Sequence, residues 1–203
     1  MTVLYFVRHG QTWANEQGIK QGMLNDDRTK LTVQGQLQMQ RLQQSLTMVG
    51  VDRIICSPLQ RARESAAILN QTRQVPLLVD DKLAELSYGT GDGLETRQLL
   101  HQHPACFDPH TQDIRVVPAP TLRYKSEQIE TFLTEVTQKY PDESLLIVTH
   151  GWTIKMVLCM ALSGGEAQGI MDPDNASVTK ITTDGQSETY YLDYYNRCVQ
   201  AKF

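Results

Sequence analysis

Four side chains that can bind or attack an anion stand at or close behind the ends of three short apolar runs: Arg8, His9, Arg61 and His150. Arginine carries a permanent forked charge that suits phosphate oxygens. Histidine titrates near neutral pH, and an imidazole between guanidinium groups is biased toward its neutral form, which leaves a ring-nitrogen lone pair for attack. Because phosphoryl transfer mainly needs positioning and positive charge around oxygens, these residues favour that reaction, with His9 as nucleophile.

A leaving alkoxide also needs a proton, and Glu85 is the candidate donor. It lies among apolar residues in the sequence Leu83-Ala84-Glu85-Leu86. Desolvation and a nearby dianion raise the pKa of a carboxyl group, as a general acid requires. With its role reversed, Glu85 could then activate water. A solvated loop carboxylate is the alternative interpretation.

The apolar runs themselves predict the elements that position these side chains. Short β-rich runs predict strands, and amphipathic or apolar stretches predict helices. Ser57, Pro58 and Gln60 form a capping-box pattern at the start of the second helix. Strands are expected at 3–7, 53–56, 75–79 and 145–148, with 178–181 and 189–192 at a sheet edge, and helices at 31–49, 57–72, 96–103, 126–140 and 152–162.

This alternation predicts an α/β sandwich with a mostly parallel sheet. In an open parallel sheet, ligands bind outside the carboxyl ends of the strands. Three segments follow such strand ends: Arg8 to Gly10, Ser57 to Arg61, and His150 with Gly151. We therefore expect them to converge at one rim. A structural histidine at a strand end remains the alternative for His9 taken alone.

At this point the chain resembles the histidine phosphatase superfamily, also called the phosphoglycerate mutase-like family. The resemblance covers nearly the whole chain, and its motifs occur in the family's order. They are Val7 to Thr12 with Asn15, Leu31-Thr32 with Gly35, Ser57 to Ala62, Glu85 with Gly89, Val148 to Gly151, and Asn175 to Thr179.

The resemblance implies that His9 becomes phosphorylated, that Arg8, Arg61 and His150 bind the phosphoryl group, and that Glu85 donates the proton. It implies Asn15 as a further phosphate contact, and the substrate-binding set also includes the motif positions Gln11, Thr12 and Gly151. The implied fold is a three-layer α/β/α sandwich in one domain over 1–203, with a lid-like insertion at about 89–124 and no cofactor or metal. Lys155 stands where members often have arginine, and Trp152 is bulky; both bear on leaving-group specificity.

Three functions are compatible with these residues. The first is a phosphatase that hydrolyses small phosphorylated metabolites through a phosphohistidine. The second is a phosphoglycerate mutase; mutases that resemble this family have a longer insertion with two adjacent arginines, and 89–124 contains no such pair. The third is a non-catalytic phosphate-binding module, against which the complete set of nucleophile and acid speaks.

Other polar residues have simpler interpretations. The spacing of His101, His103 and His110 does not bring them onto one face, so surface histidines are expected rather than a metal site. Asp26 and Asp27 could join His9 in a metallohydrolase, but a solvated loop is favoured. Three cations in or beside the insertion could meet a second anionic group on the substrate, or remain solvated: Arg97, Arg123 and Lys125.

Composition excludes several classes of protein. The 203 residues carry 19 basic and 23 acidic side chains, a net charge of −4, so the basic footprint of a nucleic-acid-binding protein is missing. Four scattered cysteines favour neither a disulfide framework nor a zinc site. Residues 1–8 do not resemble a signal peptide, and the run Met156 to Leu162 is too short to cross a bilayer. The expected location is the cytoplasm; oligomeric state is left open.

Overall fold

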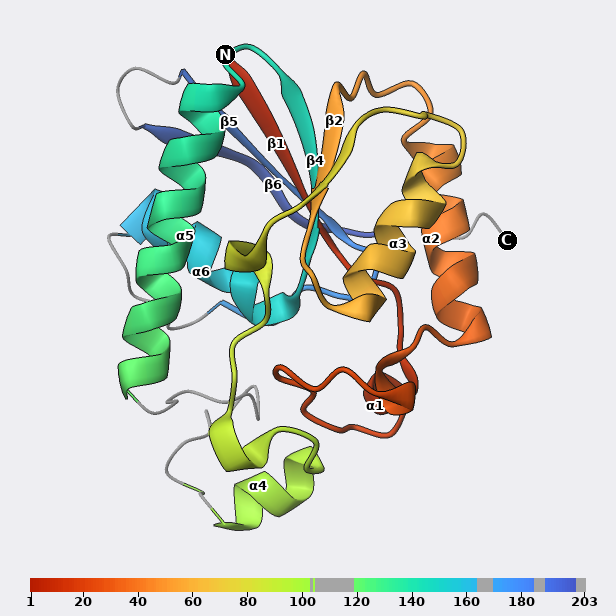
Figure 1. Ribbon diagram of the computed structural model, residues 1–203, viewed down its shortest axis with the longest axis vertical. Helices are drawn as coiled ribbons and strands as arrows, with labels where there is room; N and C mark the ends of the chain where they lie inside the picture. The colour runs from red at the N-terminus through yellow and green to blue at the C-terminus, as the bar shows by residue number, and fades with distance from the viewer. Residues whose placement is uncertain (103, 105–118, 164–169, 185–188, 200–203) are drawn as a thin grey trace.

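A six-stranded sheet lies between two layers of helices in the computed structural model (Figure 1). The structure describes all residues except 103, 105–118, 164–169, 185–188 and 200–203. Helices α5 and α6 cover one face of the sheet, and α2 and α3 cover the other. The predicted three-layer α/β fold is therefore confirmed.

The strands follow the predicted apolar runs closely. In sheet order β3-β2-β4-β1-β5-β6, neighbours β3–β2, β2–β4 and β4–β1 are parallel, whereas β1–β5 and β5–β6 are antiparallel. The sheet is thus mostly parallel, as predicted. The strands are β1 Thr2–Arg8, β2 Arg53–Cys56, β3 Leu77–Val79, β4 Ser144–Thr149, β5 Val178–Thr183 and β6 Tyr190–Arg197.

The two late strands lie together at one side of the sheet, as predicted. Strand β6 is the edge strand, and β5 lies between β1 and β6. Strand β5 pairs along its whole length with β1, from Thr183 opposite Thr2 to Val178 opposite Val7. Strand β5 is accordingly mostly buried.

The helices also match the predicted order. The 126–140 helix begins earlier than predicted, at Ala119, so its first turns overlap the expected insertion at about 89–124. The lid-like role of that insertion and the single domain over 1–203 stay predictions. The helices are α1 Trp13–Glu16, α2 Val33–Ser45, α3 Gln60–Asn70, α4 Thr96–Gln102, α5 Ala119–Lys139 and α6 Gly151–Ser163, with short 3₁₀ turns η1 Asp27–Thr29, η2 Asp81–Leu83 and η3 Gly89–Gly91.

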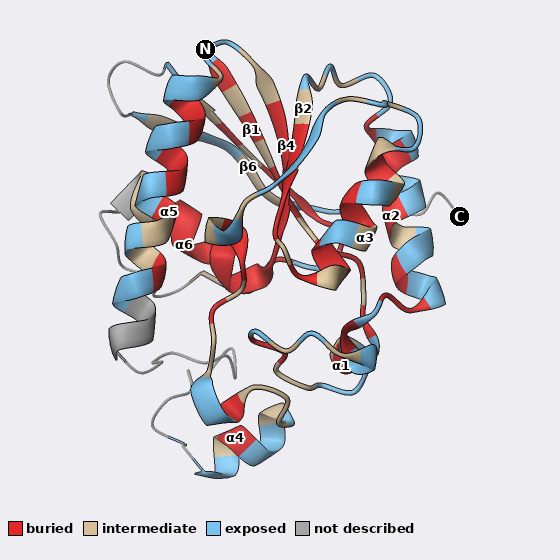
Figure 2. Ribbon diagram, in the orientation of Figure 1, coloured by how far each residue is buried: buried red, intermediate tan, exposed pale blue. Residues whose placement is uncertain are grey.

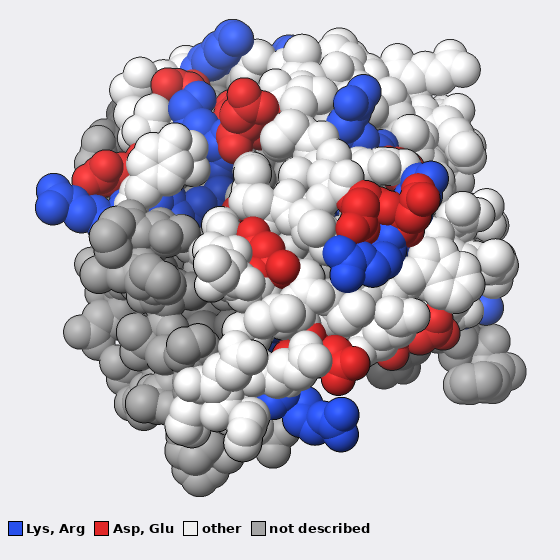
Figure 3. Space-filling model, turned by 60° about the horizontal axis from the view of Figure 1, so that its bottom comes forward, with Lys and Arg blue, Asp and Glu red and all other residues white. Residues whose placement is uncertain are grey.

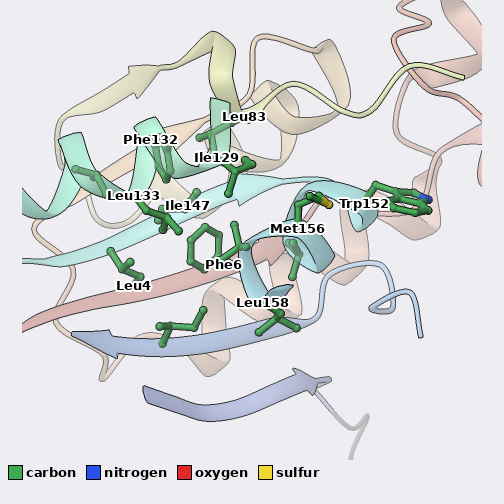
Figure 4. Close-up of a cluster of buried hydrophobic side chains, with 14 of the residues drawn as sticks. Leu4, Phe6, Leu83, Ile129, Phe132, Leu133, Ile147, Trp152, Met156 and Leu158 are labelled. Carbon is green, nitrogen blue, oxygen red and sulfur yellow. The ribbon is translucent and has the colours of Figure 1, made fainter. Parts of the chain in front are cut away.

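Alternate residues of the central strands fill two separate cores. In β4, Leu145 and Ile147 pack in the cluster under α5 and α6, and Leu146 and Val148 pack in the cluster under α2 and α3. The central strands are correspondingly buried from both sides (Figure 2). Figure 4 shows the first cluster, with Trp152 at one end of it, beyond Met156 and toward the carboxyl ends of the strands.

The carboxyl ends of β1, β2 and β4 finish at the same level. Arg8 is opposite Thr149, and Cys56 is opposite Val148. The next residues, His9, Ser57 and His150, therefore emerge together at one rim, which confirms the expected convergence. Beyond this rim lie α1 and α4 (Figure 1).

The start of α3 differs from the predicted capping box. The helix begins at Gln60, and Leu59 is its N-cap without a side-chain hydrogen bond. Ser57 lies two residues before the N-cap, where its hydroxyl contacts Nε2 of His150, at 2.7 Å, and accepts from the Leu59 N–H, at 3.3 Å. Instead Asn25 Oδ1 accepts a hydrogen bond from the Gln60 N–H, at 2.9 Å. Arg61 still falls in the first turn of the helix.

Two chain segments cross closely just after β1. A Cβ atom added at Gly35 would lie 2.0 Å from the carbonyl oxygen of Gln11, and one added at Gly10 would lie 2.5 Å from that of Gly35. Because these neighbours are backbone atoms, only glycine fits at either position. The contact holds the segment after His9 against the start of α2.

Candidate active site

His9 is buried at the end of β1, with 2% of its surface exposed. Its Nδ1 atom lies 2.8 Å from the carbonyl oxygen of Gly10. A carbonyl can only accept, so Nδ1 carries the proton and Nε2 keeps its lone pair. Burial, and then the charges of Arg61 and Arg8, hold the pKa of His9 well below its usual value. The ring is therefore neutral, and the lone pair of Nε2 is available.

Arg61 is buried beside the two histidines, with 1% of its surface exposed. Its guanidinium donates to the carbonyls of Leu24, at 3.0 Å, and Gly22, at 2.8 Å. Its Nε–H donates to Nδ1 of His150, at 3.2 Å. Burial lowers the pKa of Arg61 to about 10, so it remains a cation at neutral pH. Three of its five N–H groups are used by the protein, and the others can meet an anion.

His150 packs edge-on against His9, with the ring centroids 5.2 Å apart. Because Nδ1 accepts from Arg61, the proton is on Nε2, which donates to the Ser57 hydroxyl at 2.7 Å. Burial, and then the charge of Arg61, lower the pKa of His150 well below its usual value. In this conformation both ring nitrogens have protein partners, and His150 supports the site through Arg61.

A cavity of about 170 Å³ opens next to His9. Of the predicted site residues, it is lined by Arg8, His9, Asn15, Arg61, Glu85 and Gly151. Arg8 donates to the carbonyl of Pro173, and its buried Nε–H has no hydrogen-bond partner among the described residues. Two guanidinium groups and a neutral imidazole thus border one small space.

Asn15 reaches the cavity from α1. Its Oδ1 accepts from the N–H of Thr12 and from Nδ2 of Asn175, both at 3.2 Å. The amide nitrogen is therefore the group that Asn15 can offer to a phosphate oxygen. Asn175 also donates to the carbonyl of His9, at 3.0 Å, so this pair fixes the backbone of His9.

Gln11 and Thr12 do not line the cavity. Gln11 Oε1 accepts from the Thr32 hydroxyl, at 2.9 Å, and Thr12 is the fully buried N-cap of α1. The structure places both residues as supports of the turn between β1 and α1. Their substrate contacts stay predictions.

Glu85 also lines the cavity and lies at the N-terminus of α6. One carboxylate oxygen accepts from the Thr153 N–H at 3.2 Å, and the other from the Trp152 N–H at 3.3 Å. Burial raises the pKa of Glu85, whereas the Leu86 N–H and the charges of Arg61 and Lys125 oppose this increase. A carboxyl group with a raised pKa that borders the cavity can act as an acid and, once ionised, as a base.

The cavity lining also includes an acidic residue that the sequence did not assign. Asp172 lines the cavity and pairs with Lys155 at 3.1 Å. Lys155 also lies 4.5 Å from the centre of the Trp152 ring. Lys155 and Trp152, the two positions at which the sequence departs from the family pattern, therefore lie side by side next to the cavity. No local sequence pattern predicts that Asp172 lines the cavity, because its position depends on the loop before β5.

Most other charged candidates lie outside the site. Asp26 pairs with Arg28 at 2.8 Å and Asp27 with Lys30 at 2.6 Å, as expected for a solvated loop. His101 is exposed on α4, and His103 and His110 lie outside the described residues. Across the part of the chain that the structure describes, no group of three His, Cys, Asp or Glu could hold a metal ion.

The three cations of the expected insertion have different environments. Arg97 and Arg123 are solvated, with 90% and 84% of their side chains exposed. Lys125 is buried, with 3% exposed, so it is not solvated. It does not line the cavity, and its contact with a substrate stays a prediction. Figure 3, which brings the rim forward, shows acidic and basic side chains side by side on the surface. The positive charge of the site comes from Arg8 and Arg61, which line the cavity.

Comparisons with known proteins identify the family and several relatives. The model of a family described as histidine phosphatase superfamily (branch 1) matches residues 4–195. A protein of Hydrogenobacter thermophilus named "Putative phosphoserine phosphatase 2" is 32% identical over 97% of this chain and 96% of its own length. Phosphatase PhoE of Bacillus subtilis, named as uncharacterized, is 29% identical over 83% of this chain and 81% of its own.

A solved structure shares the fold and carries a phosphatase name. The mycobacterial glucosyl-3-phosphoglycerate phosphatase, determined with VO3, superposes with a TM-score of 0.83. It is 25% identical and covers 96% of this chain and 98% of its own. Among the described residues of our chain, no helix has the length and apolar character needed to span a membrane.

Proposed function

This chain belongs to the histidine phosphatase superfamily, and from that premise we propose that it hydrolyses small phosphate monoesters through a phosphohistidine on His9. One observation carries the proposal: the lone pair of His9 Nε2 is free, while Arg8 and Arg61 border the same cavity. The unpaired Nε–H of Arg8 gives a phosphoryl oxygen a ready donor. A buried guanidinium N–H without a partner is costly, so an anion at this place stabilises the site.

In the first half-reaction, His9 Nε2 attacks phosphorus, and the bond to the ester oxygen breaks. The N–P bond forms while Glu85 gives its proton to the departing alkoxide, which leaves as an alcohol. Arg8, Arg61 and the Asn15 amide stabilise the negative charge on the transferred oxygens. Glu85 is then a carboxylate, held by the N–H groups of Trp152 and Thr153.

In the second half-reaction, water takes the place of the alcohol. Glu85 accepts a proton from the water as its oxygen attacks phosphorus, and the N–P bond breaks. Inorganic phosphate leaves, His9 regains its lone pair, and Glu85 is protonated again. No cofactor or metal ion enters this scheme, and the arginines supply the positive charge.

The size of the cavity supports a small leaving group. About 170 Å³ is well below the roughly 300–1,000 Å³ of sites for drug-sized ligands. The relatives are named for phosphoserine, alpha-ribazole and glucosyl-3-phosphoglycerate phosphatases, so the family accepts esters of several sizes. We propose a small phosphorylated metabolite as substrate, in the cytoplasm and without a nucleic-acid or membrane partner.

The test compares hydrolysis with mutase activity. The protein is incubated with p-nitrophenyl phosphate and, separately, with 3-phosphoglycerate and its bisphosphate. We expect phosphate release and an acid-labile phosphoprotein, both lost in His9→Ala but retained in His101→Ala, which changes an exposed histidine. Residual turnover above about a tenth of wild type in His9→Ala would falsify the nucleophile assignment. Interconversion of phosphoglycerates without net hydrolysis would identify a mutase.

A further inference from the structure

Lys125 is a buried cation that the mechanism above does not use. It lies near the start of α5, and 3% of its surface is exposed. A buried ammonium group is costly unless its N–H groups find acceptors and its charge finds a partner. Its surroundings therefore indicate what it contributes.

The acceptors of Lys125 are backbone carbonyls next to Glu85. Its Nζ donates to the carbonyl of Lys82, at 2.6 Å, and to the carbonyl of Ala84. These two residues bracket Leu83 at the end of η2, and Ala84 directly precedes Glu85. Lys125 thus binds the segment that carries the general acid.

Two other side chains hold the same segment. The Thr149 hydroxyl at the end of β4 donates to the Leu83 carbonyl, at 2.7 Å. The Thr153 hydroxyl in α6 donates to the Ala84 carbonyl, at 3.0 Å. Three consecutive carbonyls before Glu85 are therefore fixed by side chains from three different elements. Of these three side chains, Lys125 is the charged one.

The charge of Lys125 acts on Glu85 together with other groups around the carboxyl. Arg61 of α3 and Lys125 of α5 both lower the pKa of Glu85, and Asp172 raises it. Conversely, burial lowers the pKa of Lys125 to about 8, while Glu85 and Asp80 oppose that change. A protonated Lys125 therefore favours the ionised form of Glu85.

We propose that Lys125 is a positioning residue for Glu85, which fixes the carbonyls on both sides of Leu83 and stabilises the carboxylate that Glu85 becomes after donating its proton. The inference rests on the proposed function, in which Glu85 alternates between acid and base. A neutral side chain of similar length would fill the same space, but it would lack the charge.

The test uses the dependence of rate on the leaving group. The nitrophenolate of p-nitrophenyl phosphate leaves with little protonation, whereas the alkoxide of glycerol phosphate needs a proton. A defect that acts through Glu85 must therefore affect the alkyl ester more, and kcat/KM reports this first chemical step. A general loss of structure lowers both rates equally.

We expect Lys125→Gln to lower kcat/KM for glycerol phosphate about tenfold or more and that for p-nitrophenyl phosphate less than about threefold. Loss of the cation also raises the pKa of Glu85, so the alkaline limb of the pH profile moves to higher pH. Lys125→Arg should restore much of the activity. Arg123→Gln removes an exposed cation from the same helix and should change neither rate.

A second comparison links Lys125 directly to Glu85. In a Glu85→Gln background, Lys125→Gln should lower kcat/KM less than about twofold further, because residues that act as a unit are non-additive. Equal losses for the two esters, an unmoved pH limb, or a full additional loss in the double variant would each overturn the inference.

The outcomes also separate this inference from the proposed function. A wild-type protein that hydrolyses neither ester contradicts the proposed function, whereas an active wild type with a normal Lys125→Gln variant contradicts the role of Lys125 alone. If circular dichroism shows that Lys125→Gln is unfolded, Lys125→Met is judged by the same criteria. If both are unfolded, Lys125 belongs to the fold and the inference fails.

Discussion

The Nε–H of Arg61 donates a hydrogen bond to the Nδ1 atom of His150, at 3.2 Å. This contact joins the first turn of α3 to the end of β4, two segments distant in the sequence. It sets the tautomer of His150, and it orients the guanidinium plane next to His9. Arg61 and His150 therefore form one hydrogen-bonded unit beside His9.

The two ring nitrogens of His150 should contribute differently to activity, with Nδ1 the more important. An asparagine at this position can place an oxygen near Nδ1 and keep the acceptor for Arg61, whereas glutamine can reach only the region of Nε2 and the Ser57 hydroxyl. We expect His150→Asn to retain about tenfold more kcat/KM for p-nitrophenyl phosphate than His150→Gln, since a hydrogen bond from a charged group contributes about 1.5–3 kcal/mol.

The control for this comparison is His101→Asn, a change at an exposed position of α4 that should leave the rate unchanged. Equal activities of the two His150 variants, or a more active His150→Gln, would contradict the dominant role of the Arg61 contact.

Glu85→Gln should remove the acid catalysis by Glu85 while keeping its hydrogen bond to the N-terminus of α6. The amide oxygen can still accept from the Thr153 N–H, but the group no longer donates a titrating proton. We expect kcat/KM for alkyl phosphates to fall by about 10²–10⁴-fold, with a much smaller loss for p-nitrophenyl phosphate.

The pH profile gives a second reading of the same variant. Burial raises the pKa of Glu85, and the acid must be protonated to act, so wild-type activity falls as pH rises through that raised value. This limb should be missing in Glu85→Gln. Glu127→Gln, at an exposed position of α5, is the control. If the fall in activity at high pH is unchanged in Glu85→Gln, a group other than Glu85 causes it.

Lys125 should make the free energy of unfolding depend on alkaline pH. Its pKa is about 8 in the folded protein, against the 10.5 of an ordinary lysine, so the unfolded chain binds more protons between these values. Stability contributed by this group therefore rises as pH increases from about 8 to 10.5. The upper limit, at 1.36 kcal/mol for each pKa unit, is about 3 kcal/mol.

Urea unfolding of wild type and Lys125→Met across this pH range measures the effect. We expect the difference in free energy of unfolding to shift in favour of wild type as pH rises, since the variant lacks the titrating group. A difference that is constant with pH would show that Lys125 is not a buried cation.

Gly35→Ala should destabilise the turn that carries His9. The added Cβ atom would lie 2.0 Å from the Gln11 carbonyl oxygen, and backbone atoms on both sides leave little room to adjust. We expect a loss of about 1–3 kcal/mol in the free energy of unfolding, together with lower activity. Gly50→Ala, with no atom within 4 Å of the added Cβ, is the matched control. Equal stability of the two variants would argue against the close crossing.

The sequence by itself predicted the order and type of the elements and the rim that they share. Those features follow from local information: the apolar run before Arg8 must be buried, and its carboxyl end determines where His9 emerges. Parallel strands align their carboxyl ends, so His150 could be assigned to the same rim. The apolar neighbours of Glu85 indicated a proton donor, and the motif resemblance added Asn15; both residues line the cavity.

Only the tertiary structure decided which side chains and backbone groups contact one another. The pattern at Ser57 predicts the N-cap of α3, but α3 begins at Gln60, and the Ser57 hydroxyl accepts from His150 and from the Leu59 N–H. The sequence predicts that Lys125 contacts solvent or substrate, yet it holds the backbone before Glu85. The contacts with His150 and with this backbone join residues far apart in the chain. A local pattern of residues predicts which helix or strand a residue belongs to. Its hydrogen-bond partners, tautomer and pKa shift depend instead on the groups that folding brings into contact with it.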